Sequence, residues 1–266
     1  MTQRNTRSQW TVRDEQMMRF LAEQWCADRD TIALLRGVER RRTYRLIQRW
    51  RDEFAMVNST PLIPKSADRV VTVVWPRPSV AAIALGHPVS PWSPSLDNVA
   101  HKLAVARVRA ALCGLQAGVW VPERTLLREA AIAAGNRPGV IRLDASLDGD
   151  RARFPRRHVH DGRYLYRGQW LSVEVELTLK RPSRQRVAAT MLRAYKAMHA
   201  GDGLLYLYRG NRIGNALKRA IADLKTAGSL PTPFDIRLRD LDAVIERRSL
   251  ELPAASVTTT GKEPHS

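Results

Sequence analysis

The stretch DRDTIALLRGVERRRTYRLIQRWRDEF, residues 28–54, carries the clearest structural pattern in the chain. Residues 31–36 form a short helical segment, and Gly37 then interrupts the helical pattern. Along residues 38–54 the apolar positions fall on one side of a helical wheel, and arginines fill the other side. The pattern predicts a short helix, a turn and an amphipathic helix with a basic face. Two residues before the short helix are candidate caps, Asp28 and Asp30.

A helix precedes this stretch and a β-hairpin follows it. Residues 14–25 carry apolar side chains at helical spacing, namely Met17, Met18, Leu21 and Trp25. The apolar runs 62–64 and 70–75 flank the segment KSADR, which predicts two strands joined by a turn. Helix, short helix, glycine turn, basic helix and hairpin follow one another as in a winged helix–turn–helix. We assign residues 1–86 to such a domain.

The basic face of the third helix predicts binding of double-stranded DNA. Seven arginines lie between Arg36 and Arg51, and acidic residues occur only at the edge and the end of this face. A solvated charged surface is the alternative, but so many like charges repel one another unless an anion offsets them. Guanidinium groups suit phosphates and guanine edges. The predicted DNA-binding residues are Arg36, Arg40, Arg41, Arg42, Arg45 and Arg49.

The overall charge also favours a polyanionic partner. The chain has 44 Lys and Arg against 26 Asp and Glu, a formal net charge of +18, and such a field attracts nucleic acid or an anionic membrane. No apolar run reaches the roughly 18 residues that a spanning helix needs, and the polar start is unlike a signal peptide. We expect Cys26 and Cys113 to be buried thiols in a reducing compartment. A cytoplasmic nucleic-acid-binding protein without membrane association is therefore predicted.

The middle of the chain predicts a domain boundary and a bridging helix. Residues 87–95 are proline-rich and are assigned as a linker. A long helix is predicted at 96–115, and its two apolar stripes indicate that it is covered on two sides, by both domains. The stripes are Val99, Leu103, Ala106, Ala110 and Cys113, and Val105, Val108, Leu112 and Leu115.

The second domain, residues 96–251, alternates strand and helix patterns. Strands are predicted within 158–166, at 169–179 and at 204–208, with helices at 183–200 and 212–225. This alternation predicts an α/β layer arrangement with a mixed sheet. The polar tail 252–266 is expected to be disordered.

The strand 169–179 carries candidate catalytic chemistry. Its apolar face alternates with a face bearing Glu174, Glu176 and, beyond it, Lys180. The two carboxylates are about 7 Å apart, and a hard cation such as Mg²⁺ would offset their repulsion. Asp161 lies just upstream, so Asp161 with Glu174 or Glu176 predicts a Mg²⁺ site that activates water toward a phosphodiester. Lys180 would stabilise the developing negative charge.

The order of these features resembles the PD-(D/E)XK nuclease core: Asp161, an acidic strand, Lys180, a helix and an apolar strand. The whole chain resembles the replication-relaxation family of actinobacterial plasmids and mobile elements over residues 13–210, through its helix–turn–helix and four short motifs. These motifs are VVWP (73–76), WVPER (120–124), HVHDG (158–162) and VEVELTLK (173–180). The resemblance implies Asp161, Glu174, Glu176 and Lys180 as catalytic residues. It adds Glu123 to Asp161, Glu174 and Glu176 as a metal ligand.

The spacing departs from the nuclease pattern and leaves two functions open. That pattern has acid-x-Lys, whereas Lys180 follows Glu176 by four residues, about 13 Å along a strand. Either the long Lys180 side chain reaches back along the strand toward Glu176, or Glu174 and Glu176 are the acid-x-Lys pair of the pattern, with a glutamate in the lysine position. His158 and His160 precede Asp161. Each is a structural side chain, or one of them is a catalytic or DNA-contacting imidazole, and His160 stands where the pattern has proline.

The first hypothesis is a Mg²⁺-dependent DNA endonuclease targeted by the winged domain. The second is a non-catalytic DNA-binding regulator of replication, transfer or transcription with a degenerate nuclease fold. A winged domain commonly acts as a homodimer, although no separate dimerisation element is visible.

Overall fold

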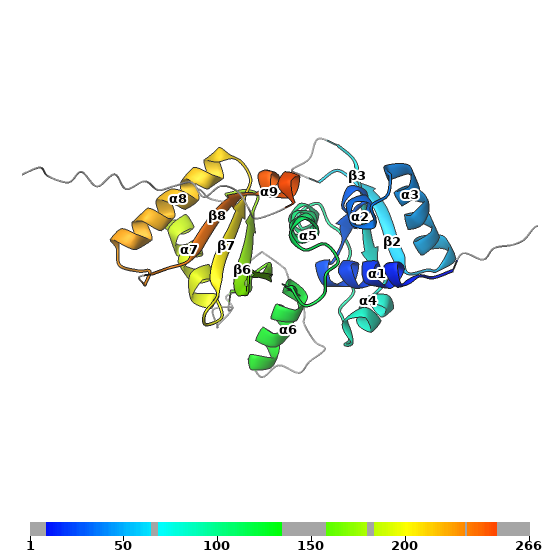
Figure 1. Ribbon diagram of the computed structural model, residues 1–266, viewed down its shortest axis with the longest axis horizontal. Helices are drawn as coiled ribbons and strands as arrows, with labels where there is room; N and C mark the ends of the chain where they lie inside the picture. Colours follow the sequence, from blue (N-terminus) through cyan, green and yellow to red (C-terminus); the bar gives the residue numbers. More distant parts are fainter. Residues whose placement is uncertain (1–8, 65–68, 135–157, 180–183, 232, 249–266) are drawn as a thin grey trace, which may run out of the picture.

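Two β-sheets organise the chain, and each lies among helices in its own lobe (Figure 1). The computed structural model describes residues 9–64, 69–134, 158–179, 184–231 and 233–248. The first lobe contains a three-stranded antiparallel sheet, and the second contains a five-stranded mixed sheet. Helix α5 (Val99–Leu112) lies between the two lobes. The predicted α/β class, with a mixed sheet in the second half, is confirmed.

The first lobe follows the predicted order of helices and strands. Its sheet has the order β1-β3-β2, and both strand pairs are antiparallel. The elements are α1 (Val12–Gln24), β1 (Ala27–Asp28), α2 (Arg29–Arg36), α3 (Arg40–Gln48), the π-helical turn η1 (Arg49–Glu53), β2 (Val57–Leu62), β3 (Val71–Pro76) and α4 (Pro78–Leu85).

Local interactions set the helix boundaries of this lobe. The Thr11 hydroxyl and the Asp14 carboxylate form a capping box at the start of α1. Asp28, one of the two predicted caps, accepts the Thr31 amide hydrogen bond at 2.8 Å. Gly37 ends α2 with φ +61°, a left-handed conformation that glycine adopts without steric cost.

One predicted boundary in this lobe was wrong. The segment 38–54 was predicted to be helical, and the structure is helical over residues 40–53, where α3 passes directly into the π-helical turn η1 at Arg49. The first strand of the hairpin was expected at 62–64, but it begins at Val57. It was missed because it is an edge strand with a largely polar sequence, which lacks the apolar signal of a buried strand. Pro61 is tolerated there because an edge strand leaves one side of its backbone unpaired.

Helix α5 packs against both lobes, as its two apolar stripes predicted. Ala106 and Ala110 belong to the core of the first lobe, with Phe20 and Trp50. Val105 and Val108 belong to a core of the second lobe, with Leu171 and Val173 among its members. Two stripe assignments were wrong, because Cys113 packs in the second lobe and Leu115 in the first. Both residues lie beyond the end of α5, where the helical periodicity no longer applies.

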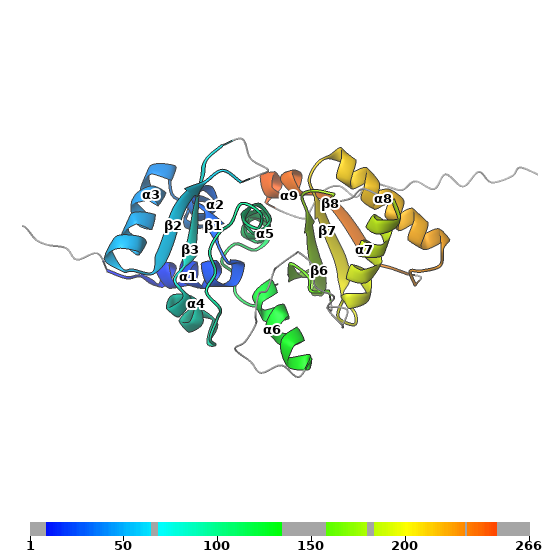
Figure 2. The ribbon, with the colours of Figure 1, turned by 180° about the vertical axis from the view of Figure 1, so that it is seen from behind.

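The second lobe has helices on both faces of its sheet. The strand order is β4-β5-β6-β7-β8; β4, β5 and β6 are antiparallel neighbours, and β7 and β8 continue parallel to β6. Helices α7 and α8 cover one face, and α5 and α9 cover the other (Figure 2). The bounds are β4 (Trp120–Pro122), α6 (Glu123–Ala133), β5 (Gly162–Tyr166), β6 (Gln169–Glu176), α7 (Arg184–Ala197), β7 (Gly203–Tyr208), α8 (Asn211–Thr226), β8 (Ile236–Asp240) and α9 (Leu241–Arg247).

Several expectations fall at the edges of the described residues or outside them. Lys180 and the tail 252–266 lie outside, so their predicted roles have no structural counterpart here.

Both thiols are free: Cys26 is buried, as predicted, and Cys113 is only partly buried. Among the described residues no helix is long and apolar enough to cross a membrane.

Candidate functional site

The exposed face of α3 is the first candidate site. Thr43 and Ile47 are buried on the inner side of the helix, and Trp50 in η1 continues this side. The outer side exposes four of the six predicted arginines together with Tyr44, namely Arg40, Arg41, Arg42 and Arg45. Within the described residues, no carboxylate forms an ion pair with Arg41, Arg42 or Arg45. These three cations are therefore available to an external anion.

Asp30 connects the start of α3 to the hairpin. Its carboxylate receives Arg40 Nε at 2.9 Å and Arg69 Nη2 at 3.3 Å. Arg69 lies just before β3, so this carboxylate links three segments of the lobe. All three side chains are substantially exposed, and the net charge of the group is positive.

Arg36 and Arg49, also predicted to contact DNA, have partners inside the lobe. Asp14, which is fully buried, receives Arg49 Nη2 at 3.1 Å and Arg36 Nη1 at 3.4 Å. The Trp50 indole Nε1 donates to the same carboxylate at 3.0 Å. Burial lowers the pKa of the Arg36 guanidinium in spite of this carboxylate. These contacts tie α2 and the end of α3 to α1.

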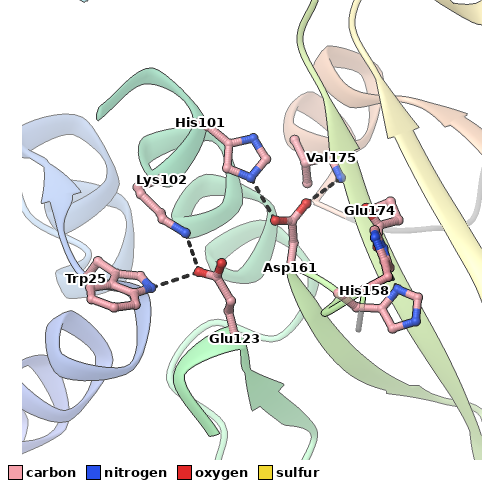
Figure 3. Close-up of polar contacts among 9 residues, drawn as sticks. Trp25, His101, Lys102, Glu123, His158, Asp161, Glu174 and Val175 are labelled. Atoms are coloured by element: carbon pink, nitrogen blue, oxygen red, sulfur yellow. Dashed lines mark hydrogen bonds and ion pairs between the residues drawn. The ribbon is translucent and has the colours of Figure 1, made fainter. Parts of the chain in front are cut away.

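The second candidate site lies where β5 and β6 meet α5 (Figure 3). Asp161 directly precedes β5, and its Oδ2 accepts the Val175 amide at 2.8 Å. Its Oδ1 is 2.7 Å from His101 Nε2, which extends from α5. Burial opposes ionisation of Asp161, but the charge and the hydrogen bond of His101 outweigh it, so the Asp161 pKa lies below its ordinary value. The charge of Asp161 in turn raises the pKa of His101.

Glu174 is held by two imidazoles. His158 Nε2 lies 2.7 Å and His160 Nδ1 lies 2.6 Å from the same oxygen, Glu174 Oε1. The hydrogen bond to Glu174 raises the pKa of His158, in spite of partial burial. His160 is buried, and its Nε2 has no hydrogen-bond partner among the described residues.

Glu176 is the third acid of this region. Burial raises the pKa of its carboxyl, and the neighbouring charges of Glu174 and Asp161 add to the shift. The buried Tyr206 on β7 faces the same three acids, and burial together with their charges raises its pKa. The structure thus brings Asp161, Glu174 and Glu176 within electrostatic range of one another. Among the described residues, Glu174 alone of the three belongs to a group of three or more potential metal ligands, the one that it forms with His158 and His160.

Glu123 has a different set of partners. Its carboxylate pairs with Lys102 of α5 and accepts the Trp25 indole Nε1 at 2.9 Å (Figure 3). It therefore connects α6 to α5 and to the end of α1. No contact with Asp161 or Glu174 is seen among these described residues, so its predicted role as a metal ligand is not supported by direct proximity.

Sequence reasoning missed His101 as a partner of Asp161. It lies 60 residues before Asp161 on a helix, with no motif around it, and only the packing of α5 on the sheet brings the two together. His158 and His160 were noticed as flanking residues, but their shared contact with Glu174 was not predicted.

Comparison with protein-family models, curated proteins and solved structures found no match. The resemblance to the replication-relaxation family therefore rests on the sequence motifs alone.

Proposed function

We propose that this chain is a DNA-binding protein of a plasmid or other mobile element, and that a winged helix–turn–helix in its first lobe presents α3 to duplex DNA. The observation that carries the proposal is the exposed row of Arg41, Arg42 and Arg45, which have no carboxylate partner among the described residues. Helices α2 and α3, joined at Gly37, and the hairpin β2–β3 follow in the order that this motif requires.

The inner contacts of the lobe support this function. Asp14 and Trp50 hold the end of α3 against α1, so the outer arginines project from a rigid support. A rigid helix reduces the conformational entropy lost when its side chains bind phosphates or bases. The net charge of +18 supplies the long-range attraction to a polyanion.

The test measures binding of a fluorescently labelled DNA duplex by anisotropy. The double variant Arg41→Ala/Arg45→Ala is expected to bind several-fold or more weakly than the parent. Arg212→Ala/Arg219→Ala removes the same charge from exposed positions of α8 and is expected to bind nearly as well as the parent. Equal affinities for the two double variants would show that α3 is not the DNA-binding element.

A second function, metal-dependent phosphodiester cleavage, is favoured by one further observation. Asp161, Glu174 and Glu176 interact electrostatically: burial raises the pKa of Glu176, and the charges of Glu174 and Asp161 add to this shift. Strand β6 is followed by α7 and the apolar strand β7, the order that we expect of a PD-(D/E)XK-like domain. Asp161 with Glu174 or Glu176 would hold Mg²⁺, which when bound would activate water and offset charge on the phosphate.

A plasmid-nicking assay distinguishes this enzyme from the alternative, a non-catalytic DNA-binding regulator. The protein is incubated with supercoiled plasmid and Mg²⁺ or Mn²⁺. An endonuclease nicks the plasmid, and both Asp161→Ala and Glu176→Ala abolish nicking. The control Glu129→Gln removes an exposed carboxylate of α6 and leaves nicking unchanged. Absence of nicking by the parent, or nicking that survives both alanine variants, excludes the enzyme and favours the regulator.

A further inference from the structure

His158, His160 and Glu174 form a compact group of potential metal ligands. One ligand atom from each side chain lies within 4.8 Å of the others. Across the residues that the structure describes, no other group of three or more His, Cys, Asp or Glu side chains meets this criterion. His158 and His160 are two positions apart before β5, and Glu174 lies on the adjacent strand β6. The backbone of two paired segments therefore positions all three.

The two imidazole nitrogens converge on one carboxylate oxygen. His158 Nε2 and His160 Nδ1 lie 2.7 and 2.6 Å from Glu174 Oε1. Bonds of about 2.0–2.1 Å from each ligand to a tetrahedral metal ion would require separations of about 3.3 Å between ligand atoms. The two imidazole nitrogens would therefore have to move about 0.6 Å farther from the Glu174 oxygen to admit the ion.

Burial makes the group unlike an exposed charge cluster. The side chains of His160 and Glu174 are 5% and 13% exposed, and that of His158 is 26% exposed. Burial and a shared carboxylate oxygen therefore distinguish this group from a solvated charge cluster.

We propose that His158, His160 and Glu174 bind a divalent transition-metal ion of the Zn²⁺ type. Two imidazoles and one carboxylate suit Zn²⁺, Mn²⁺ or Fe²⁺, whereas Mg²⁺ prefers oxygen ligands alone. Three protein ligands leave a coordination position for water or a substrate atom, and the partly exposed His158 marks the open side. This site uses Glu174, leaves Asp161 and Glu176 to the Mg²⁺-dependent alternative, and does not depend on DNA binding or cleavage.

Isothermal titration calorimetry tests the site. The full-length protein is first freed of bound metal with a chelator and is then titrated with Zn²⁺ in the presence of excess Mg²⁺. One Zn²⁺ per chain is expected to bind. Glu174→Gln, which preserves side-chain shape, and His158→Ala, at the most exposed ligand, are each expected to weaken binding by about 100-fold or more. His199→Ala removes an exposed imidazole after α7 and leaves binding unchanged.

Circular dichroism melts in the absence of metal show whether each variant is folded, and Zn²⁺ is expected to raise the melting temperature of the parent but not of folded Glu174→Gln. Absence of Zn²⁺ binding by the parent would overturn the proposal. So would full displacement of Zn²⁺ by Mg²⁺, or retention of parental affinity by both ligand variants. DNA affinity measured on the same samples reports separately on α3.

Discussion

Removal of the Asp14 carboxylate is predicted to destabilise the first lobe strongly. Asp14 is fully buried. Besides the capping hydrogen bonds at Thr11, its oxygens receive the Arg49 and Arg36 guanidiniums and the Trp50 indole. Asp14→Ala would leave two largely buried cations, 26% and 13% exposed, without their anion.

The magnitude follows from these contacts. Loss of one partner from a buried ion pair costs about 3–5 kcal/mol, and loss of a helix cap costs about 1 kcal/mol. Because guanidiniums that are partly exposed recover some hydration, we expect Asp14→Ala to lower the free energy of unfolding by about 4 kcal/mol. Asp14→Asn keeps an acceptor for Trp50 but loses the charge, and about 2 kcal/mol is expected.

Urea unfolding followed by circular dichroism measures both losses. Asp52→Ala is the matched control, because Asp52 has a 57% exposed side chain and, within the part of the chain that the structure describes, an ion pair only with its neighbour Arg51. We expect that control to change the free energy of unfolding by less than about 0.5 kcal/mol. A loss below about 1 kcal/mol for Asp14→Ala would refute the argument that this carboxylate anchors α3.

Three further outcomes are expected. Each phosphate contact steepens the slope of log K for DNA binding against log salt concentration by about 0.9. If Arg41 and Arg45 each contact one phosphate, then raising the salt from 50 to 200 mM should weaken binding by Arg41→Ala/Arg45→Ala by a factor about 12-fold smaller than for the parent; equal slopes in parallel titrations would contradict this. Gly162→Ala would place its Cβ in steric conflict with the Trp120 ring, and a loss of about 1–3 kcal/mol in the free energy of unfolding by urea is expected; an unchanged urea midpoint would contradict the packing. Burial raises the pKa of the Cys113 thiol to about 11, so iodoacetamide at pH 8 should react about 100-fold more slowly than with an ordinary thiol, and faster as the pH rises; mass spectrometry showing ordinary reactivity would contradict this.

The helices and strands that the sequence predicted well are those with local signals. The cap at Asp28, the break at Gly37 and the apolar stripe of α3 act between residues that are close along the chain. Their effects are therefore present before any tertiary contact forms. The apolar strand β7 and the amphipathic helix α8 were predicted for the same reason.

The elements that were missed depend on contacts that are distant in sequence. Strands β4 and β8 lie at the two edges of the larger sheet, where one side of the strand needs no partner and the apolar alternation is weak. Strand β1 has only two residues and exists because it pairs with β3. Such short strands gain their stability from the partner, so their own sequence carries little signal.

The candidate sites divide in the same way. The sequence by itself determined that one helix would carry a dense arginine face and that one strand would carry alternate glutamates, because both patterns follow from the fixed periodicity of helix and strand. The tertiary structure alone decided that Arg36 and Arg49 pair with the buried Asp14, whereas Arg41 and Arg45 stay exposed. It alone placed two histidines on Glu174 and His101 on Asp161. Periodicity determines which side of an element a residue occupies, but the packing of other elements against that side determines its partners.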